Sequence, residues 1–100
     1  MLYLILGDDA ADALPRRRAA RPAHLEHLKA LQAEGRLILA GPRPRVDARD
    51  AGEAGFHGSL IVAEFADLEA ARAWAAADPY AQAGVFAQVT VQPFVKVLPA

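Results

Sequence analysis

Apolar runs separated by turn residues predict four strands and two helices along this chain. Residues 2–6 are all apolar and are followed by Gly7-Asp8-Asp9, the length and ending of a strand. Further strands are predicted over residues 36–41, 59–65 and 85–97. Pro93 removes a backbone donor from the last strand, which predicts a sheet edge or a bend there.

The helices are predicted from their start and stop residues. Residues 8–21 are polar, and we expect a loop there with one or two helical turns. Pro22 suits a first helical position and Gly35 is a common stop, so the first helix is predicted from Pro22 to about Glu34. Asp67 is expected to cap a second helix over residues 68–77, and Asp78-Pro79 to begin a short turn ended by Gly84. Residues 42–58 have no apolar period and are predicted as a loop.

The order strand-helix-strand-strand-helix-strand predicts one α+β domain over residues 1–100. It is the ferredoxin-like arrangement, an antiparallel sheet with two helices on one face. A sheet with one wet face alternates apolar and polar residues. Here Leu2, Leu4 and Leu6 point to one face and Tyr3 and Ile5 to the other. Because the helices cover one face, we expect a homodimer through the sheet faces; a monomer with scattered exposed apolar residues is the alternative.

Composition narrows the classes of function. The formal net charge of −1 predicts binding to neither nucleic acid nor an anionic membrane. The chain has no cysteine, which excludes disulfides, thiolate catalysis and cysteine-ligated metals. No run approaches the roughly 20 apolar residues of a membrane span, and the apolar N-terminus has no basic region before it. We therefore expect a cytoplasmic protein.

His24 is the first candidate for chemistry. On a helical wheel it lies between Leu28 and Leu31, inside the buried stripe and in the first turn of the predicted helix. The macrodipole at a helix N-terminus and partial burial both favour a neutral imidazole, which can act as a base near pH 7. A core histidine that only bonds a backbone carbonyl is the structural alternative.

Asp78 is the second candidate. It follows the apolar stripe of the second helix and is expected to turn partly inward. An acid at a helix C-terminus is electrostatically unfavourable, although Asp78 also suits the cap of the next turn, with Pro79 at its first position. The spacing in the sequence leaves open whether His24 and Asp78 meet.

Other polar residues are weaker candidates. Asp8, Asp9 and Asp12 are expected to be solvated loop acids rather than metal ligands. Arg16 to Arg18 and Arg21 fit a solvated face better than an anion site. Ser59 lacks the motif of a nucleophile elbow, Trp74 is a candidate interface residue, and Tyr80 a candidate pocket wall with a hydroxyl group.

Several segments together resemble the YCII-related (YciI-like) family, in the order in which that family has them. They are Arg21-Pro22-Ala23-His24-Leu25, Glu34-Gly35-Arg36-Leu37, Ala40-Gly41-Pro42, Gly55-Phe56-His57-Gly58-Ser59, Ala77-Asp78-Pro79-Tyr80 and residues 91–97. The resemblance implies a dimeric α+β barrel, in which two ferredoxin-like sheets face each other. It also implies an active site at His24 and Asp78.

The residues and the resemblance together predict an enzyme of lyase or isomerase type that uses neither a cofactor nor a metal. His24 would act as base or acid and Asp78 would orient it, on a small oxygenated metabolite such as an aromatic one. Tyr80 and Phe56 would wall the pocket, and Arg21 would attract an anionic group. A small-molecule-binding or interaction module without turnover is the first alternative, and a purely structural dimer is the second.

Overall fold

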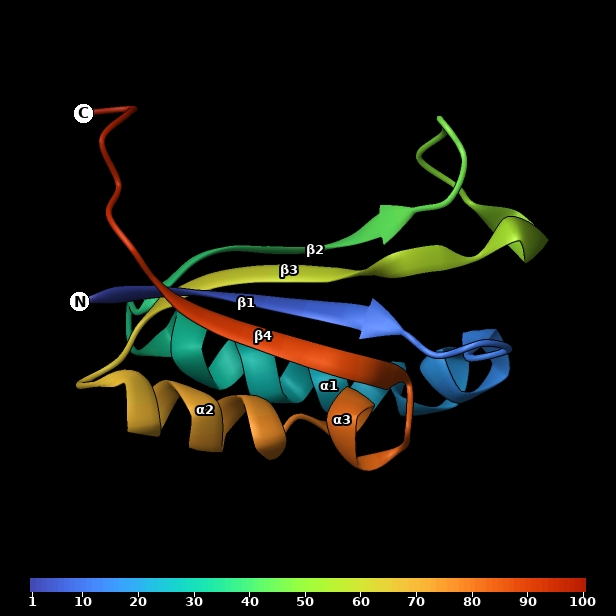
Figure 1. The fold of residues 1–100 in the computed structure, drawn as a ribbon, viewed down its shortest axis with the longest axis horizontal. Coiled ribbons are helices and arrows are strands. Elements are labelled where there is room, and N and C mark those ends of the chain that lie inside the picture. Colours follow the sequence, from blue (N-terminus) through green and yellow to red (C-terminus); the bar gives the residue numbers. More distant parts are fainter.

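The computed structural model describes residues 1–100 and contains four strands and three α-helices (Figure 1). In chain order they are β1 (Leu2–Asp9), α1 (Leu14–Ala33), β2 (Leu37–Pro44), β3 (Phe56–Glu64), α2 (Leu68–Ala76), α3 (Pro79–Gln82) and β4 (Phe86–Phe94), with a short 3₁₀ turn at Gly52–Ala54 between β2 and β3. The strands form one antiparallel sheet in the order β2-β3-β1-β4. This confirms the predicted ferredoxin-like α+β fold.

The prolines of the sheet lie in its two edge strands. Pro93 is in β4 at one edge, as predicted, while Pro42 and Pro44 lie in β2 at the other. An edge strand has one unpaired side, so it tolerates the missing N–H. For this reason β2 continues to Pro44, beyond its predicted end at residue 41. Two other strands are also longer than predicted, since β1 continues to Asp9 and β3 begins at Phe56. The last strand, β4, is shorter and ends at Phe94, before the predicted end at residue 97.

The first helix begins eight residues before the predicted position. α1 starts at Leu14 with Pro15 in its first turn, and Pro22 lies inside it. The one or two helical turns expected within residues 8–21 are the first turns of α1, and the prediction is wrong in placing the start of the long helix at Pro22. Pro15 supplies the helix start that was assigned to Pro22, and Pro22 is exposed, where its ring meets solvent. None of the helices combines the length and apolar character needed to cross a membrane.

The helices pack on one face of the sheet and build the main core there (Figure 1). Its buried residues come from β1, β3, both long helices and the start of the β3–α2 connection: Tyr3, Ile5, Leu28, Leu31, Ile61, Ala63, Phe65, Ala71 and Ala75. Trp74, a candidate interface residue in the sequence, is half-buried against this core and stacks on His27, with ring centroids 4.1 Å apart. It also contacts Phe65 at the edge of this core.

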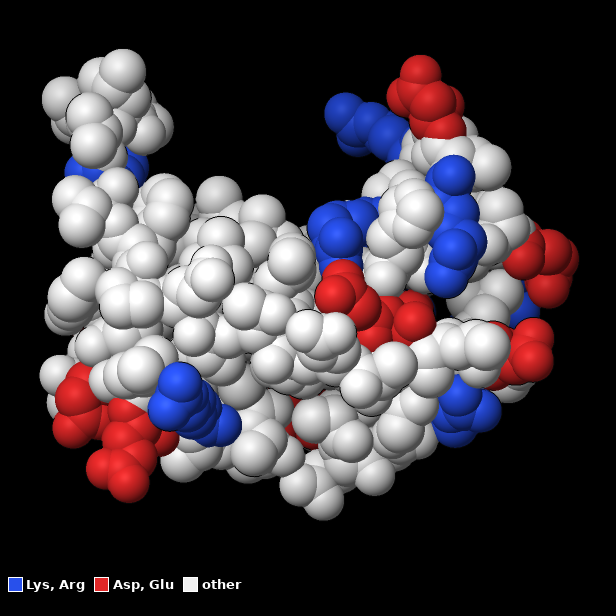
Figure 2. Space-filling view, viewed as in Figure 1, with Lys and Arg blue, Asp and Glu red and all other residues white.

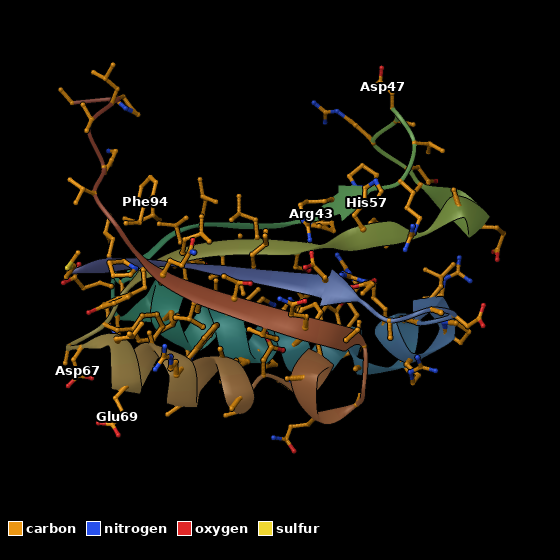
Figure 3. All side chains as sticks on the ribbon, in the orientation of Figure 1. Arg43, Asp47, His57, Asp67, Glu69 and Phe94 are labelled. Atoms are coloured by element: carbon orange, nitrogen blue, oxygen red, sulfur yellow. The ribbon has the colours of Figure 1, made fainter.

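The other face of the sheet has no helix over it. Leu2, Leu4 and Leu6 face this side and are only half-buried, and Phe94 points the same way in Figure 3. The C-terminal residues 95–100 and the β2–β3 loop both extend beyond this face at opposite ends of the sheet (Figure 1). Figure 2 shows the surface hollowed between them and free of charged side chains over most of its width. We call this surface the open face.

Candidate active site

A cavity of about 370 Å³ lies between α1, the edge strand β2 and the β2–β3 loop. Four of the residues predicted for the site line it: His24, Tyr80, Phe56 and Arg21. His24 and Tyr80 are buried in its wall, Phe56 is half-buried and Arg21 is exposed at its rim. Its size suits a small metabolite, because pockets for such ligands begin at about 300 Å³.

His24 and Asp78 meet behind this wall. His24 Nδ1 and Asp78 Oδ1 are 2.7 Å apart, and both side chains are more than nine-tenths buried. Asp78 is the N-cap residue of α3, and the same Oδ1 accepts the backbone N–H of Tyr80 at 2.9 Å. The predicted capping role is confirmed. Capping and histidine binding therefore use one carboxylate, whose position α3 fixes.

The contact with Asp78 assigns the two ring nitrogens of His24. An ionised carboxylate can only accept hydrogen bonds, so Nδ1 carries the proton that it donates to Asp78. In the neutral imidazole, Nε2 then holds the lone pair. No protein group bonds to Nε2, and His24 lines the cavity. The arrangement presents a base to whatever the cavity holds.

The place of His24 within its helix differs from the prediction. Because α1 begins at Leu14, His24 lies about three turns after the helix start. The macrodipole acts mainly within the first turn, so the argument that it favours a neutral imidazole is wrong for His24. Hydrogen bonding to Asp78 and stacking on Tyr80 orient the ring instead.

Tyr80 forms the floor on which His24 lies. The two rings are stacked, with centroids 3.7 Å apart and planes 8° from parallel. Burial raises the pKa of the Tyr80 hydroxyl above its ordinary value, and the nearby Arg17 charge opposes this only in part. Tyr80 is therefore a neutral phenol at physiological pH. It supplies a flat apolar surface and cannot compete with His24 as a base.

Arg17 is a further candidate residue of the site, which the sequence pattern did not single out. It is 4% exposed, binds Asp9 through two hydrogen bonds of 2.9 Å and donates another to Ser59 Oγ at 3.0 Å. The predictions that Arg17 lies on a solvated face and that Asp9 is a solvated loop acid are both wrong, because the two form a buried ion pair. Arg17, His24, Leu28 and Leu31 are the four buried residues of α1. Extending the helix backwards would have placed Arg17 in that stripe.

The remaining polar side chains near the site lie at the rim of the cavity or outside it. Arg18 lines the rim and pairs with Glu53 at the surface, while His57 is exposed and does not line the cavity. Asp8 belongs to β1 rather than to a loop, and its side chain, 45% exposed, accepts a hydrogen bond from Arg43 on the opposite side of the sheet. Asp12 is exposed, as predicted. These residues contribute less to the site than the buried set around Tyr80.

Comparison with known proteins gives one family and several similar chains. A family model described as the YCII-related domain matches residues 1–95. Protein YciI of Escherichia coli O6:H1 is 58% identical over 97 residues, which cover 97% of this chain and 99% of that protein. A protein of Emericella nidulans named derivative of benzaldehyde biosynthesis cluster protein C is 37% identical and covers 86% of each chain.

One solved structure is similar over nearly the whole fold. It is the 5-chloro-2-hydroxyhydroquinone dehydrochlorinase of Burkholderia phenoliruptrix, in complex with 2,5-dihydroxybenzoquinone. The two chains superpose with a TM-score of 0.83 and are 26% identical, covering 95% of this chain and 94% of the other. The fold described above is therefore that of a known group of proteins.

Proposed function

This chain belongs to the YCII-related family, and we propose that it is an enzyme that moves a proton on a small oxygenated metabolite through His24 and Asp78. The observation that carries the proposal is the free Nε2 of His24 in the cavity wall, with its other nitrogen 2.7 Å from a buried carboxylate. The same division of labour between base and orienting acid occurs in other His–Asp pairs.

The reaction begins with proton transfer to His24. Nε2 takes a proton from a C–H or O–H bond of the substrate, and the electron pair of that bond stays on the substrate and spreads to a neighbouring oxygen. Asp78 stabilises the imidazolium that forms. Return of the proton at another position completes an isomerisation. Loss of a leaving group with its bonding pair, while His24 passes its proton to water, completes an elimination.

The substrate class is inferred from the cavity and from similar proteins. Tyr80 and Phe56 offer flat apolar surfaces that suit a ring, and Arg18 and Arg21 at the rim favour a ligand with negative charge. One similar protein acts on a chlorinated hydroxyhydroquinone and another is named for a benzaldehyde biosynthesis cluster. We take hydroxylated aromatic compounds as the first class to test.

A binding module without turnover is the second candidate. The observation that favours it is that the cavity wall contains one histidine and no second acid–base group of comparable burial, since Tyr80 is held as a neutral phenol. Such a protein would hold its ligand in the same cavity and release it unchanged.

Turnover of ring compounds by matched histidine variants tests the proposal. The protein is incubated with a panel of hydroxylated aromatics that includes 5-chloro-2-hydroxyhydroquinone, and product and released chloride are measured. We expect His24→Ala to be at least about 10²-fold slower than the wild type, the usual contribution of general acid–base catalysis. His27→Ala is the matched control, because His27 lies on the same helix but stacks on Trp74 outside the cavity.

Asp78→Asn separates orientation from capping. The amide oxygen can still accept the Tyr80 N–H, so the fold is kept, but the stabilising charge is lost and turnover should fall. If His24→Ala converts a substrate at the wild-type rate, the proposal is wrong. A panel compound that binds in the cavity and is recovered unchanged favours the binding module.

We also propose that two copies pair through their open faces. The support is the apolar character of that face, where Leu39 and Phe94 are 48% and 37% exposed in the single chain. Apolar surface of this kind on a small protein commonly marks an interface.

A further inference from the structure

Arg17, the buried arginine of the site, does not use all of its hydrogen-bond donors within the protein. A guanidinium has five N–H groups. The Nε of Arg17 and one N–H of Nη2 bind the two oxygens of Asp9, and the second N–H of Nη2 binds Ser59 Oγ. Nη1 makes no short, well-aligned hydrogen bond to the protein, although the Tyr80 hydroxyl is close enough to Arg17 for hydrogen bonding between them to lower the pKa of Tyr80. The one polar side-chain atom fully buried without a partner is Nε of Arg43, so Nη1 of Arg17 retains access to the cavity that Arg17 lines.

Ser59 adds a further donor at the same point. Its Oγ accepts from Arg17, and the hydroxyl hydrogen has no acceptor in the protein. Ser59 is 3% exposed and lines the cavity from β3. A buried hydroxyl whose proton is unused is a ready donor to a ligand oxygen.

Arg17 and His24 contact the same aromatic ring, that of Tyr80. The Arg17 guanidinium carbon is 4.7 Å from the centre of the Tyr80 ring, and the His24 ring is 3.7 Å from it. Arg17 and His24 are two turns apart on α1, about 10.5 Å along its axis. Phe56, 4.8 Å from the guanidinium, limits movement of Arg17 on another side. Arg17 and His24 both line the same cavity, so one ligand held there can contact both groups.

The pairing of Arg17 with Asp9 determines which kind of ligand oxygen these donors bind best. Asp9 balances the charge of Arg17 and holds the guanidinium in a fixed orientation through two hydrogen bonds. Fixed donors that are already in place stabilise charge that develops during a reaction, with no cost of rearrangement. They suit an oxygen that is neutral in the bound substrate and becomes negative once the proton has left.

We propose that Arg17 and Ser59 bind the substrate oxygen that becomes negatively charged when His24 removes a proton. The assignment rests on the proposed function and narrows its substrate class. The substrate has either a carbonyl oxygen conjugated to the acidic C–H or O–H bond, as in hydroxyquinones, or a ring hydroxyl that is itself the acid, as in hydroxylated aromatics. The electron pair released by proton transfer to His24 Nε2 settles on that oxygen, and Arg17 and Ser59 donate to it.

Binding of an ionisable hydroxyquinone tests the assignment. Calorimetric titration with 2,5-dihydroxybenzoquinone, over a pH range in which the probe ionises, compares the wild type with Ser59→Ala and Arg17→Lys. We expect each variant to bind the ionised probe at least about tenfold more weakly, the usual loss for a hydrogen bond to a charged group. We also expect each variant to lose the wild-type preference for the ionised over the neutral form.

Arg43→Lys is the matched control. Arg43 also pairs with an aspartate of β1, Asp8, but on the opposite side of the sheet and outside the cavity. The Arg43→Lys variant should bind the probe as the wild type does. Ser59→Ala leaves the Arg17–Asp9 pair intact, so it decides the matter if Arg17→Lys does not fold. Wild-type affinity and pH preference in Ser59→Ala overturn the assignment, as does a wild type that binds no ionised probe.

The two proposals fail differently. Probe binding by Ser59→Ala tests only the proposed oxygen site, and wild-type binding there would leave the role of His24 untouched. Retention of turnover in His24→Ala concerns the base alone, and that variant should still bind the probe because Arg17 and Ser59 remain.

Discussion

At the scale of single residues, the site depends on hydrogen bonds that assign one role to each polar group. His24 and Asp78 could be selected from the sequence because each lies in or beside an apolar stripe. Their contact could not, since it joins residues from α1 and the start of α3. Arg17 and Asp9 were missed because charged residues are usually exposed, and only the folded structure shows that the two neutralise each other.

The raised pKa of Tyr80 predicts how the stability of the protein changes at alkaline pH. Its folded pKa is raised by burial, so below about pH 10 the phenol is protonated in both folded and unfolded chains. Above about pH 10 the unfolded chain loses that proton first, and the wild type loses stability by up to about 1.4 kcal/mol per pH unit. Tyr80→Phe has no such proton to lose.

Urea denaturation of the wild type and Tyr80→Phe at about pH 9 and about pH 11 measures this difference. The wild type should lose more free energy of unfolding than the variant between the two pH values. Equal losses in the two proteins would show that burial does not hold the phenol neutral.

At the scale of elements, the sequence predicts the types and order of the strands and helices better than their ends. The apolar runs give the centre of every strand, and Pro93 correctly marks an edge. The start of α1 was misplaced because both Pro15 and Pro22 can begin a helix, and the polar surface of residues 15–22 hides the single buried position, Arg17. The end of β2 was predicted too early because Pro42 and Pro44 usually end a strand. The sequence does not show that β2 is an edge strand, which tolerates them.

Two glycines of the sheet give a prediction about strand packing. A Cβ atom at Gly58 of β3 would overlap the Gly7 carbonyl oxygen of β1 and Nη2 of Arg43, whereas a Cβ at Gly41 of β2 would meet nothing within 4 Å. Gly58→Ala should therefore lose about 2–3 kcal/mol of unfolding free energy, because the backbone of β1 must shift. Gly41→Ala should change it by less than about 0.5 kcal/mol.

Thermal or urea unfolding of both variants checks this prediction. A Gly58→Ala protein as stable as the wild type would mean that β1 and β3 are further apart at this point than described here.

At the scale of the whole molecule, the fold places an apolar sheet face opposite the helices. The two-faced strands indicated this from the sequence, since Leu4 and Ile5 are both apolar yet point to opposite sides. The hollow between residues 95–100 and the β2–β3 loop did not follow from the sequence, because residues 95–97 were assigned to a strand. The β2–β3 loop also contributes Asp50 and Gly52 to the cavity wall, so a partner over the open face would lie close to the site.

Light scattering tests the pairing of two copies. At micromolar concentration the wild type should have about twice the chain mass of 10.7 kDa. Leu39→Glu places a charge on the open face, next to Val62 in the register, and should yield a folded monomer. Ala30→Glu, exposed on α1, is the control and should keep the mass of the wild type. A wild type that has the mass of one chain would contradict the pairing.

The central claim is that His24 transfers a proton to and from a ring compound in the cavity. The most direct measurement is the rate at which the ring protons of 2,5-dihydroxybenzoquinone exchange with deuterium in D₂O, followed by NMR, because it detects proton transfer without any leaving group. We expect the wild type to accelerate exchange by at least about 10²-fold and His24→Ala to return it to the uncatalysed rate. Exchange at the uncatalysed rate with the wild type saturated by the probe, or equal acceleration by His24→Ala, would contradict the claim.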